Sequence, residues 1–186
     1  ASVYDDDDGD WTLWKSTDGG YAWTKTAFVD YAYDAIYDIA CAPNWSTNKT
    51  VYIATGDEDG DAAVYRIPDA GAGTPVLLKS IVDNDYNIAD EIHDIDLWWD
   101  GSNMWVMVAT NIDVLVIKDA LFEDWRDQEL TISFDGSPLD FYNEALVCRF
   151  APDFSSSSLI WAIIRDSDGD FWVASTKSPG QWWQII

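Results

Sequence analysis

The chain has 186 residues, of which 48% are hydrophobic, and its 34 acidic against 10 basic residues give a formal net charge of -24. This apolar content is enough for a hydrophobic core and excludes a wholly disordered chain. The negative field repels nucleic-acid phosphates and anionic lipid surfaces, and no apolar run reaches membrane-spanning length. The composition therefore argues against nucleic-acid binding and membrane insertion and favours cationic or basic partners.

The first predicted elements are three strands over residues 1–4, 11–17 and 23–28, which are rich in β-branched and aromatic residues. An acidic segment, DDDDGD (residues 5–10), separates the first two strands, and STDGG (residues 16–20) begins the second turn. Both segments contain Asp-Gly, a strong hairpin signal. The pattern predicts the second, third and fourth strands of a four-stranded unit whose first strand is missing.

Four more strands are predicted over residues 38–42, 51–55, 63–67 and 75–81. The first contains Cys41, and Cys148 lies in a comparable apolar run, so we predict two buried free thiols rather than a disulfide framework. The turn after the first of these strands carries two glycosylation sequons, at Asn44 and Asn48. They matter only if the protein enters a glycosylating compartment.

The same order of elements recurs along the chain. The glycines of three D-x-D-G-D segments, Gly9, Gly60 and Gly169, are separated by 51 and 109 residues, and strand-like runs begin at Thr50, Trp105 and Leu159. The repeat is therefore about 51 to 55 residues long and holds four short strands, which is typical of a β-propeller blade.

We accordingly predict an all-β chain that is a single propeller segment over residues 1–186, with three complete blades and most of a fourth. The blades cover approximately residues 1–30 (partial), 31–85, 86–138 and 139–186. A stack of this size leaves sheet faces and edges uncovered. Further segments or further copies of the chain are therefore expected to complete a larger ring.

One turn resembles a known family. Ser16, Asp18, Gly20 and Trp23 fit the S-x-D-x-G-x-x-W Asp box of BNR-repeat propellers, and Ser175 with Trp182 keep the same spacing without the aspartate. The resemblance implies a structural turn between the third and fourth strands of a blade, in which the Trp fills the gap between sheets. It also implies kinship with sialidase, sortilin-type and xyloglucan-degrading propellers. Asp18 and Trp23 are given no catalytic role.

The acidic turns have two interpretations. Asp-Gly alone explains a hairpin, but alternating carboxylates around a glycine can also supply the oxygen ligands that Ca²⁺ prefers. The predicted calcium ligands are the aspartates of the three D-x-D-G-D segments: Asp6, Asp8, Asp10, Asp57, Asp59, Asp61, Asp166, Asp168 and Asp170.

Catalytic chemistry has little support in the sequence. His93 is the only histidine, and a glycosidase needs two carboxyl groups at a set separation, for which Asp94 and Asp96, with Arg149, are the candidates on inner strands. Twelve tryptophans fit either sugar binding or packing between sheets. The sequence favours a non-catalytic extracellular or cell-surface structural or interaction module, such as a surface-layer or filament component, with protein or carbohydrate partners. The alternative is a fragment of a polysaccharide-active propeller enzyme.

Overall fold

The computed structural model describes residues 1–5, 10–26, 36–56, 62–81, 89, 91–120, 123–128, 132–134, 137–139, 144–166, 168–177 and 183–185. Within these ranges the chain is all-β apart from three helices of four residues each. None of the described helices is long and apolar enough to cross a membrane.

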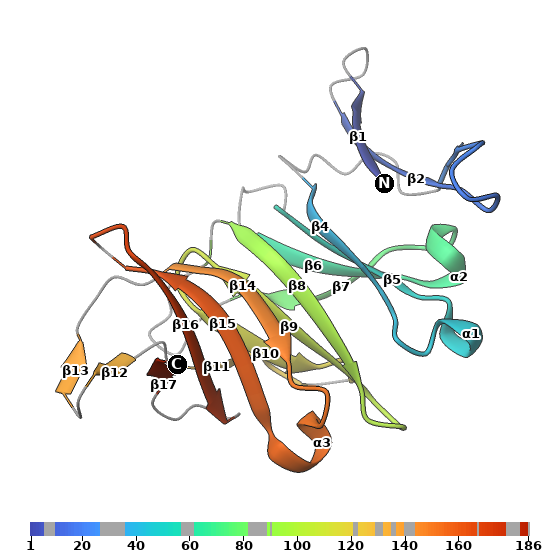
Figure 1. Cartoon of the computed structure of the whole chain (residues 1–186). Coiled ribbons are helices and arrows are strands. Elements are labelled where there is room, and N and C mark those ends of the chain that lie inside the picture. Colours follow the sequence, from blue (N-terminus) through green and yellow to red (C-terminus); the bar gives the residue numbers. More distant parts are fainter. Residues whose placement is uncertain are drawn as a thin grey trace.

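The strands form four sheets in chain order (Figure 1). The first sheet contains β1 (Ser2–Asp5), β2 (Asp10–Lys15) and β3 (Thr24–Lys25). The second sheet contains β4 (Ile36–Cys41), β5 (Val51–Gly56), β6 (Ala62–Ile67) and β7 (Val76–Ser80). The third contains β8 (Ile92–Trp99), β9 (Met104–Thr110), β10 (Val114–Lys118) and β11 (Arg126–Asp127).

The fourth sheet contains β14 (Glu144–Phe150), β15 (Leu159–Arg165), β16 (Phe171–Lys177) and β17 (Trp183–Ile185). It is extended at its edge by β12 (Ile132–Phe134), which runs parallel to β17, and β13 (Ser137–Leu139). The helices are α1 (Trp45–Asn48), α2 (Pro68–Gly71) and α3 (Phe154–Ser157). Inside α2, Asp69 and Ala70 have left-handed dihedral angles, so this segment is a turn rather than a true helix.

Two sequence predictions are confirmed at this level. The runs 51–55, 105–109 and 159–164 lie in β5, β9 and β15, and each is the second strand of its sheet. The N-terminal segment forms the three-stranded unit that the pattern predicted. In each of the other sheets the first strand bulges at the same point, just before Asp38, Asp94 and Val147.

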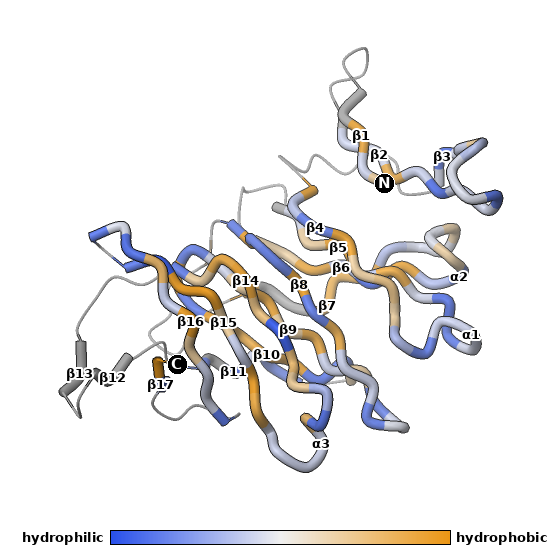
Figure 2. The backbone as a smooth tube through the Cα atoms, viewed as in Figure 1, coloured by the Kyte–Doolittle hydropathy of each residue, from blue (hydrophilic) through white to orange (hydrophobic). Residues whose placement is uncertain are grey.

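The four sheets stack face to face in chain order, and apolar side chains fill each of the three gaps. Figure 2 shows hydrophobic stretches along the strands of these sheets. Strand β5 shows how one strand serves two gaps. Val51 and Ile53 pack toward the first sheet, whereas Tyr52 and Ala54 pack toward the third. Because both faces are buried, the strand reads as a continuous apolar run instead of alternating with polar residues.

We call the face of a sheet that looks toward the next sheet its forward face, and the opposite face its backward face. The forward face of the third sheet includes Met107 and Val116, which pack against Ile160 and Ala162 of the fourth sheet. The first strands also lie next to one another, since β8 contacts both β4 and β14. The first and fourth sheets lie at opposite ends of the stack in Figure 1. The backward face of the first sheet and the forward face of the fourth sheet are therefore the two ends of the stack.

Candidate functional site

Aspartates on the first strands connect neighbouring sheets. Asp38 Oδ2 accepts a hydrogen bond from the N–H of Ile95 in the next sheet (3.1 Å). Asp94 Oδ2 accepts from the N–H of Cys148 in the sheet after that (2.8 Å). Each aspartate directly follows the bulge of its strand, and Val147 occupies the corresponding position in the fourth sheet. In the second and third sheets the bulge thus presents one carboxylate to the backbone of the following sheet.

The residues considered as a sugar site, Asp94, Asp96 and Arg149, do come together. Asp96 Oδ2 accepts from the N–H of Phe150 (2.7 Å), and the half-exposed Arg149 guanidinium binds Asp94. Burial raises the pKa of Asp94, although the Cys148 N–H and Arg149 oppose that shift. Both carboxylates already accept backbone hydrogen bonds across the gap between β8 and β14. Their arrangement is that of a link between sheets.

His93 takes part in a second link between the same two sheets. Its Nε2 lies 2.7 Å from Oε1 of Glu144, and the other oxygen of Glu144 binds Arg165. His93 is the bulged residue of β8, and Glu144 is the first residue of β14. The structure therefore places this histidine beside one carboxylate of the neighbouring sheet.

The third acidic turn is described and is organised around one carboxylate. Asp166 Oδ1 accepts from the N–H groups of Asp168 (3.0 Å) and Asp170 (2.9 Å), and Oδ2 accepts from the indole N–H of Trp172 (2.8 Å). The Trp172 bond and the Asp170 N–H lower the pKa of Asp166. Gly169 has the positive φ of 87° that the turn needs. Asp168 and Asp170 point outward and are exposed.

Most of the predicted calcium ligands lie elsewhere. Asp6, Asp8, Asp57, Asp59 and Asp61 fall outside the described residues, and only the backbone of Asp10 is described, at the start of β2. Among the described residues, no three His, Cys, Asp or Glu side chains are grouped so that they could hold a metal ion. The calcium site therefore stays a prediction for the first two turns.

The turn between β8 and β9 is built in the same way, although no sequence motif predicted it. Asp100 Oδ1 accepts from the N–H groups of Ser102 (2.8 Å) and Asn103 (2.6 Å), while Oδ2 accepts from the indole N–H of Trp105 (3.0 Å). Burial opposes ionisation of Asp100, but the hydrogen bonds from Trp105 and Asn103 outweigh it and hold its pKa well below the usual range. The signal is an aspartate followed by a glycine and, five residues later, a tryptophan.

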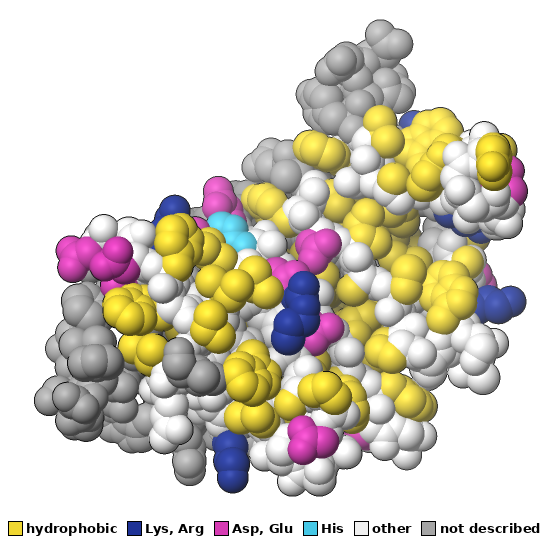
Figure 3. Space-filling view, in the orientation of Figure 1, with side chains coloured by type: hydrophobic (Ala, Val, Ile, Leu, Met, Phe, Trp, Pro, Cys, Tyr) yellow, Lys and Arg dark blue, Asp and Glu magenta, His cyan; other side chains and the backbone are white. Residues whose placement is uncertain are grey.

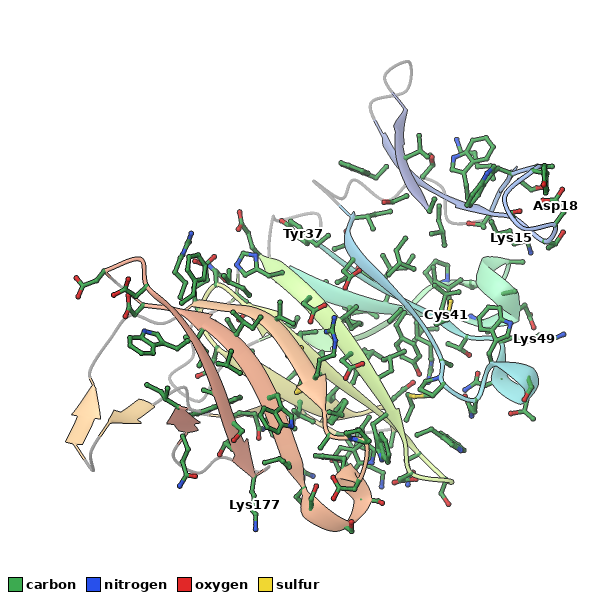
Figure 4. The ribbon with its side chains drawn as sticks, in the orientation of Figure 1. Lys15, Asp18, Tyr37, Cys41, Lys49 and Lys177 are labelled. Carbon is green, nitrogen blue, oxygen red and sulfur yellow. The ribbon has the colours of Figure 1, made fainter. Side chains whose placement is uncertain are left out.

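The Asp-box turn has the expected polar core but not the expected tryptophan. Asp18 Oδ1 accepts from the N–H of Ala22 (3.0 Å) and the hydroxyl of Ser16 (2.7 Å), and these bonds lower its pKa (Figure 4). Trp23 was expected either between blades or at a blade edge, and it does not fill a gap between sheets: its side chain is 48% exposed, and its indole N–H donates to Gly20 of the same turn. Trp182 lies outside the described residues.

The two cysteines differ. Cys148 is fully buried, and desolvation raises the pKa of its thiol, as predicted for a buried free thiol. Cys41 is also free but is exposed at the end of β4, so its predicted burial is wrong. Leu97 and Phe150, which occupy the same position in the next two sheets, are buried because a four-stranded sheet precedes each of them. In the described part of the chain the sheet that precedes Cys41 has three strands, and none of them covers that position.

A cavity of about 380 Å³ lies between the second and third sheets, at the end of the molecule where α1 and α2 are. Its floor is a three-residue cluster in which Asp119 accepts from the Tyr52 hydroxyl (2.6 Å) and from Arg66 (2.7 Å). Trp99 lines its wall.

No family model, curated protein or solved structure matches the chain.

One of the two sequon asparagines lines this cavity. Asn48 is the last residue of α1 and is exposed, whereas Asn44 precedes α1. The hydroxyl of Thr50, the third residue of the second sequon, is buried and hydrogen-bonds to Asn48. Of the two asparagines, Asn48 is therefore the more accessible to a modifying enzyme.

Proposed function

We propose that the chain is a segment of an Asp-box β-propeller that acts outside the cell or at its surface as a non-catalytic structural and interaction module. It would be completed by further sheets of the same kind. The observation that carries the proposal is the forward face of the fourth sheet. Phe171 and Val173 are 64% and 47% exposed there; Val173 lies opposite Ile163 on the neighbouring strand, and Trp161 follows Ile163 on the same face of that strand.

This face is equivalent to two faces that are covered. Strands β5, β9 and β15 align residue by residue, so the forward pair Tyr52 and Ala54 corresponds to Met107 and Ala109, and then to Trp161 and Ile163. The first two pairs are buried under the following sheet. In Figure 3 hydrophobic side chains gather on the side of the molecule where Figure 1 draws β15 and β16. Contiguous apolar patches of this kind mark interaction surfaces.

The other end of the stack offers a candidate partner surface. On the backward face of the first sheet, Val3 is 46% exposed and pairs with Thr12, whose hydroxyl accepts from the indole N–H of Trp14. A forward face and a backward face are the two surfaces that meet at every internal gap of the stack. We therefore expect one copy of the chain to place its first sheet on the fourth sheet of another, which is a head-to-tail contact.

The alternative, a fragment of a polysaccharide-active enzyme, has less support. A retaining or inverting glycosidase needs one carboxyl group that can donate a proton and one that is free to act as base or nucleophile. Asp94 and Asp96 instead accept backbone N–H groups of β14, and Asp94 also binds Arg149. Neither of these carboxylates is free for such a role.

The test uses two variants that each block one end. Val173→Asp places a charge on the forward face of the fourth sheet, and Val3→Asp places one on the backward face of the first. We expect the wild-type chain to self-associate in light scattering at physiological ionic strength, and each variant alone to stay monomeric. An equimolar mixture should form dimers, because one variant keeps an intact forward face and the other an intact backward face.

Ser155→Asp, at an exposed position in α3, adds the same charge away from both ends and should associate like the wild type. Self-association of Val3→Asp alone would show that two forward faces meet, which contradicts the head-to-tail arrangement. A wild-type chain that stays monomeric at every concentration would overturn self-assembly through these faces.

A further inference from the structure

The cavity between the second and third sheets is lined by both apolar and hydrogen-bonding groups, at the edge of the core that these two sheets share. We propose that it binds one or two rings of a neutral saccharide. The inference rests on the cavity alone and goes beyond the assembly role. The lining residues used in the argument are Tyr52, Arg66, Trp99, Ser102, Asn103 and Asp119.

The floor of the cavity is fixed before any ligand arrives. The Tyr52 hydroxyl and Arg66 Nη1 both donate to the carboxylate of Asp119, whose side chain is only 8% exposed. Arg66 itself is 38% exposed and keeps further N–H donors that face solvent. A bound hydroxyl group could therefore accept from Arg66 without breaking the cluster.

The walls are held in place as well. Ser102 and Asn103 belong to the turn that the Asp100 carboxylate organises through their N–H groups. On the opposite side, the N–H of Ala70 donates to the carbonyl of Lys49 (2.6 Å) and joins the α1 and α2 loops. Such preorganisation lowers the ordering cost of binding.

The chemistry of the lining selects the ligand class. The one arginine of the cavity is paired with its one carboxylate, so the lining offers no unpaired charge to an ionic ligand. The net charge of -24 further disfavours anions. The partly buried Trp99 and the exposed Val76 add apolar surface next to hydroxyl, amide and guanidinium groups. A sugar ring presents the matching combination of C–H surface and hydroxyl groups.

The size of the cavity agrees with this class. Its volume of about 380 Å³ lies near the lower end of the range of roughly 300 to 1,000 Å³ found for small-molecule pockets. That is room for one or two sugar rings, not for a long oligosaccharide buried along its whole length.

Isothermal titration calorimetry with maltose, cellobiose, lactose and N,N′-diacetylchitobiose tests the proposal. We expect saturable binding of at least one of these disaccharides, with a Kd of about 1 mM or tighter. Ser102→Tyr, at an exposed position on the rim, should fill the cavity and weaken that binding at least tenfold. Ser155→Tyr, in the corresponding loop of the fourth sheet, is the matched control and should bind as the wild type does.

Three outcomes overturn the proposal: no saturable binding of any of the four disaccharides, unchanged affinity in Ser102→Tyr, or loss of binding in Val173→Asp. The last result would place the sugar on the open forward face. Since Val173→Asp blocks assembly but leaves the cavity intact, failure of the assembly role and failure of the sugar site give different results.

Discussion

The third and fourth sheets have the same order of four strands, but they differ in what covers them. The third sheet is buried on both faces, and Met107 and Val114 on its forward face, the counterparts of Trp161 and Val173, have no exposed surface. The fourth sheet is covered on its backward face, while Phe171 and Val173 on its forward face are largely exposed. Apolar residues at equivalent positions are therefore core in one sheet and surface in the other. Residue type alone does not decide which.

The largest expected effect comes from truncating equivalent residues of these two sheets. Met107→Ala should lower the free energy of unfolding by about 2 to 5 kcal/mol, because it leaves a cavity in a packed interior. Trp161→Ala, at the matching position of β15, should cost clearly less in the monomer despite its larger side chain, since the forward face of the fourth sheet is open. Chemical denaturation of both variants measures the difference. An equal loss would show that the fourth sheet is covered in solution.

This contrast marks what the sequence could and could not predict. The alternation of Val51 and Ile53 with Tyr52 and Ala54 predicted a strand buried on both faces, because both sets are apolar. The exposure of Cys41 could not be predicted in this way. Whether this position is buried depends on the strands of the preceding sheet, which the local sequence around Cys41 does not reveal. Leu97 and Phe150, at the same position, are each covered by a preceding four-stranded sheet.

The candidate site was predicted less completely. Asp94, Asp96 and Arg149 were correctly expected on inner strands, but their hydrogen bonds to β14 depend on a bulge and on the stacking of sheets, which spacing does not reveal. The cavity could not be predicted at all, because Tyr52 and Arg66 belong to one repeat and Asp119 to the next, and only the stacking of the two sheets brings them together. Trp23 was misassigned because its motif fixes the turn while its ring packs on Gly20 of that turn.

The links between first strands give the next largest effect. Asp94→Ala leaves the buried N–H of Cys148 without its acceptor and should cost about 1 to 3 kcal/mol. Asp94→Asn keeps an acceptor oxygen and removes a charge that burial disfavours, so its loss should be smaller. Urea unfolding compares the two variants. Equal losses would mean that the charge, through Arg149, matters more than the hydrogen bond.

Acidification should change the stabilising effects of the Asp94 link and of the Asp100 turn in opposite directions. The pKa of Asp100 is lowered in the folded protein, so its stabilising effect is present above the usual aspartate pKa of about 3.9 and is lost as the pH falls toward the lowered value. The pKa of Asp94 is raised, so protonation of Asp94 has the opposite sign and favours the folded state.

Urea midpoints at pH 7 and near pH 3 measure these contributions. Asp100→Asn should reduce the loss of stability on acidification. Asp94→Asn should increase that loss, because it removes the carboxyl group whose protonation favours the folded state. Two variants with the same pH dependence would show that neither carboxylate controls acid stability.

The smallest effect concerns calcium, and it compares the third acidic turn with the first two. In the third turn both oxygens of Asp166 already accept N–H groups, while Asp168 and Asp170 point outward. Calcium binds through six to eight oxygens, so we expect this turn to contribute nothing to a calcium response. The D-x-D-G-D spacing still predicts ligands at Asp57, Asp59 and Asp61 of the second turn.

The measurement is the melting temperature in calcium and in chelator at fixed ionic strength. Any rise that calcium gives the wild type should persist in the double variant Asp168→Asn, Asp170→Asn, and should shrink in the double variant Asp57→Asn, Asp59→Asn, because a ligand that prefers the folded state stabilises it by mass action. Each pair removes two charges from an equivalent turn and so controls for the other.

A response that disappears with Asp168 and Asp170 would show that the third turn rearranges to bind metal. A wild-type melting temperature that ignores calcium would leave all three segments as acidic hairpin turns, repeated because each sheet must reverse the chain between its second and third strands.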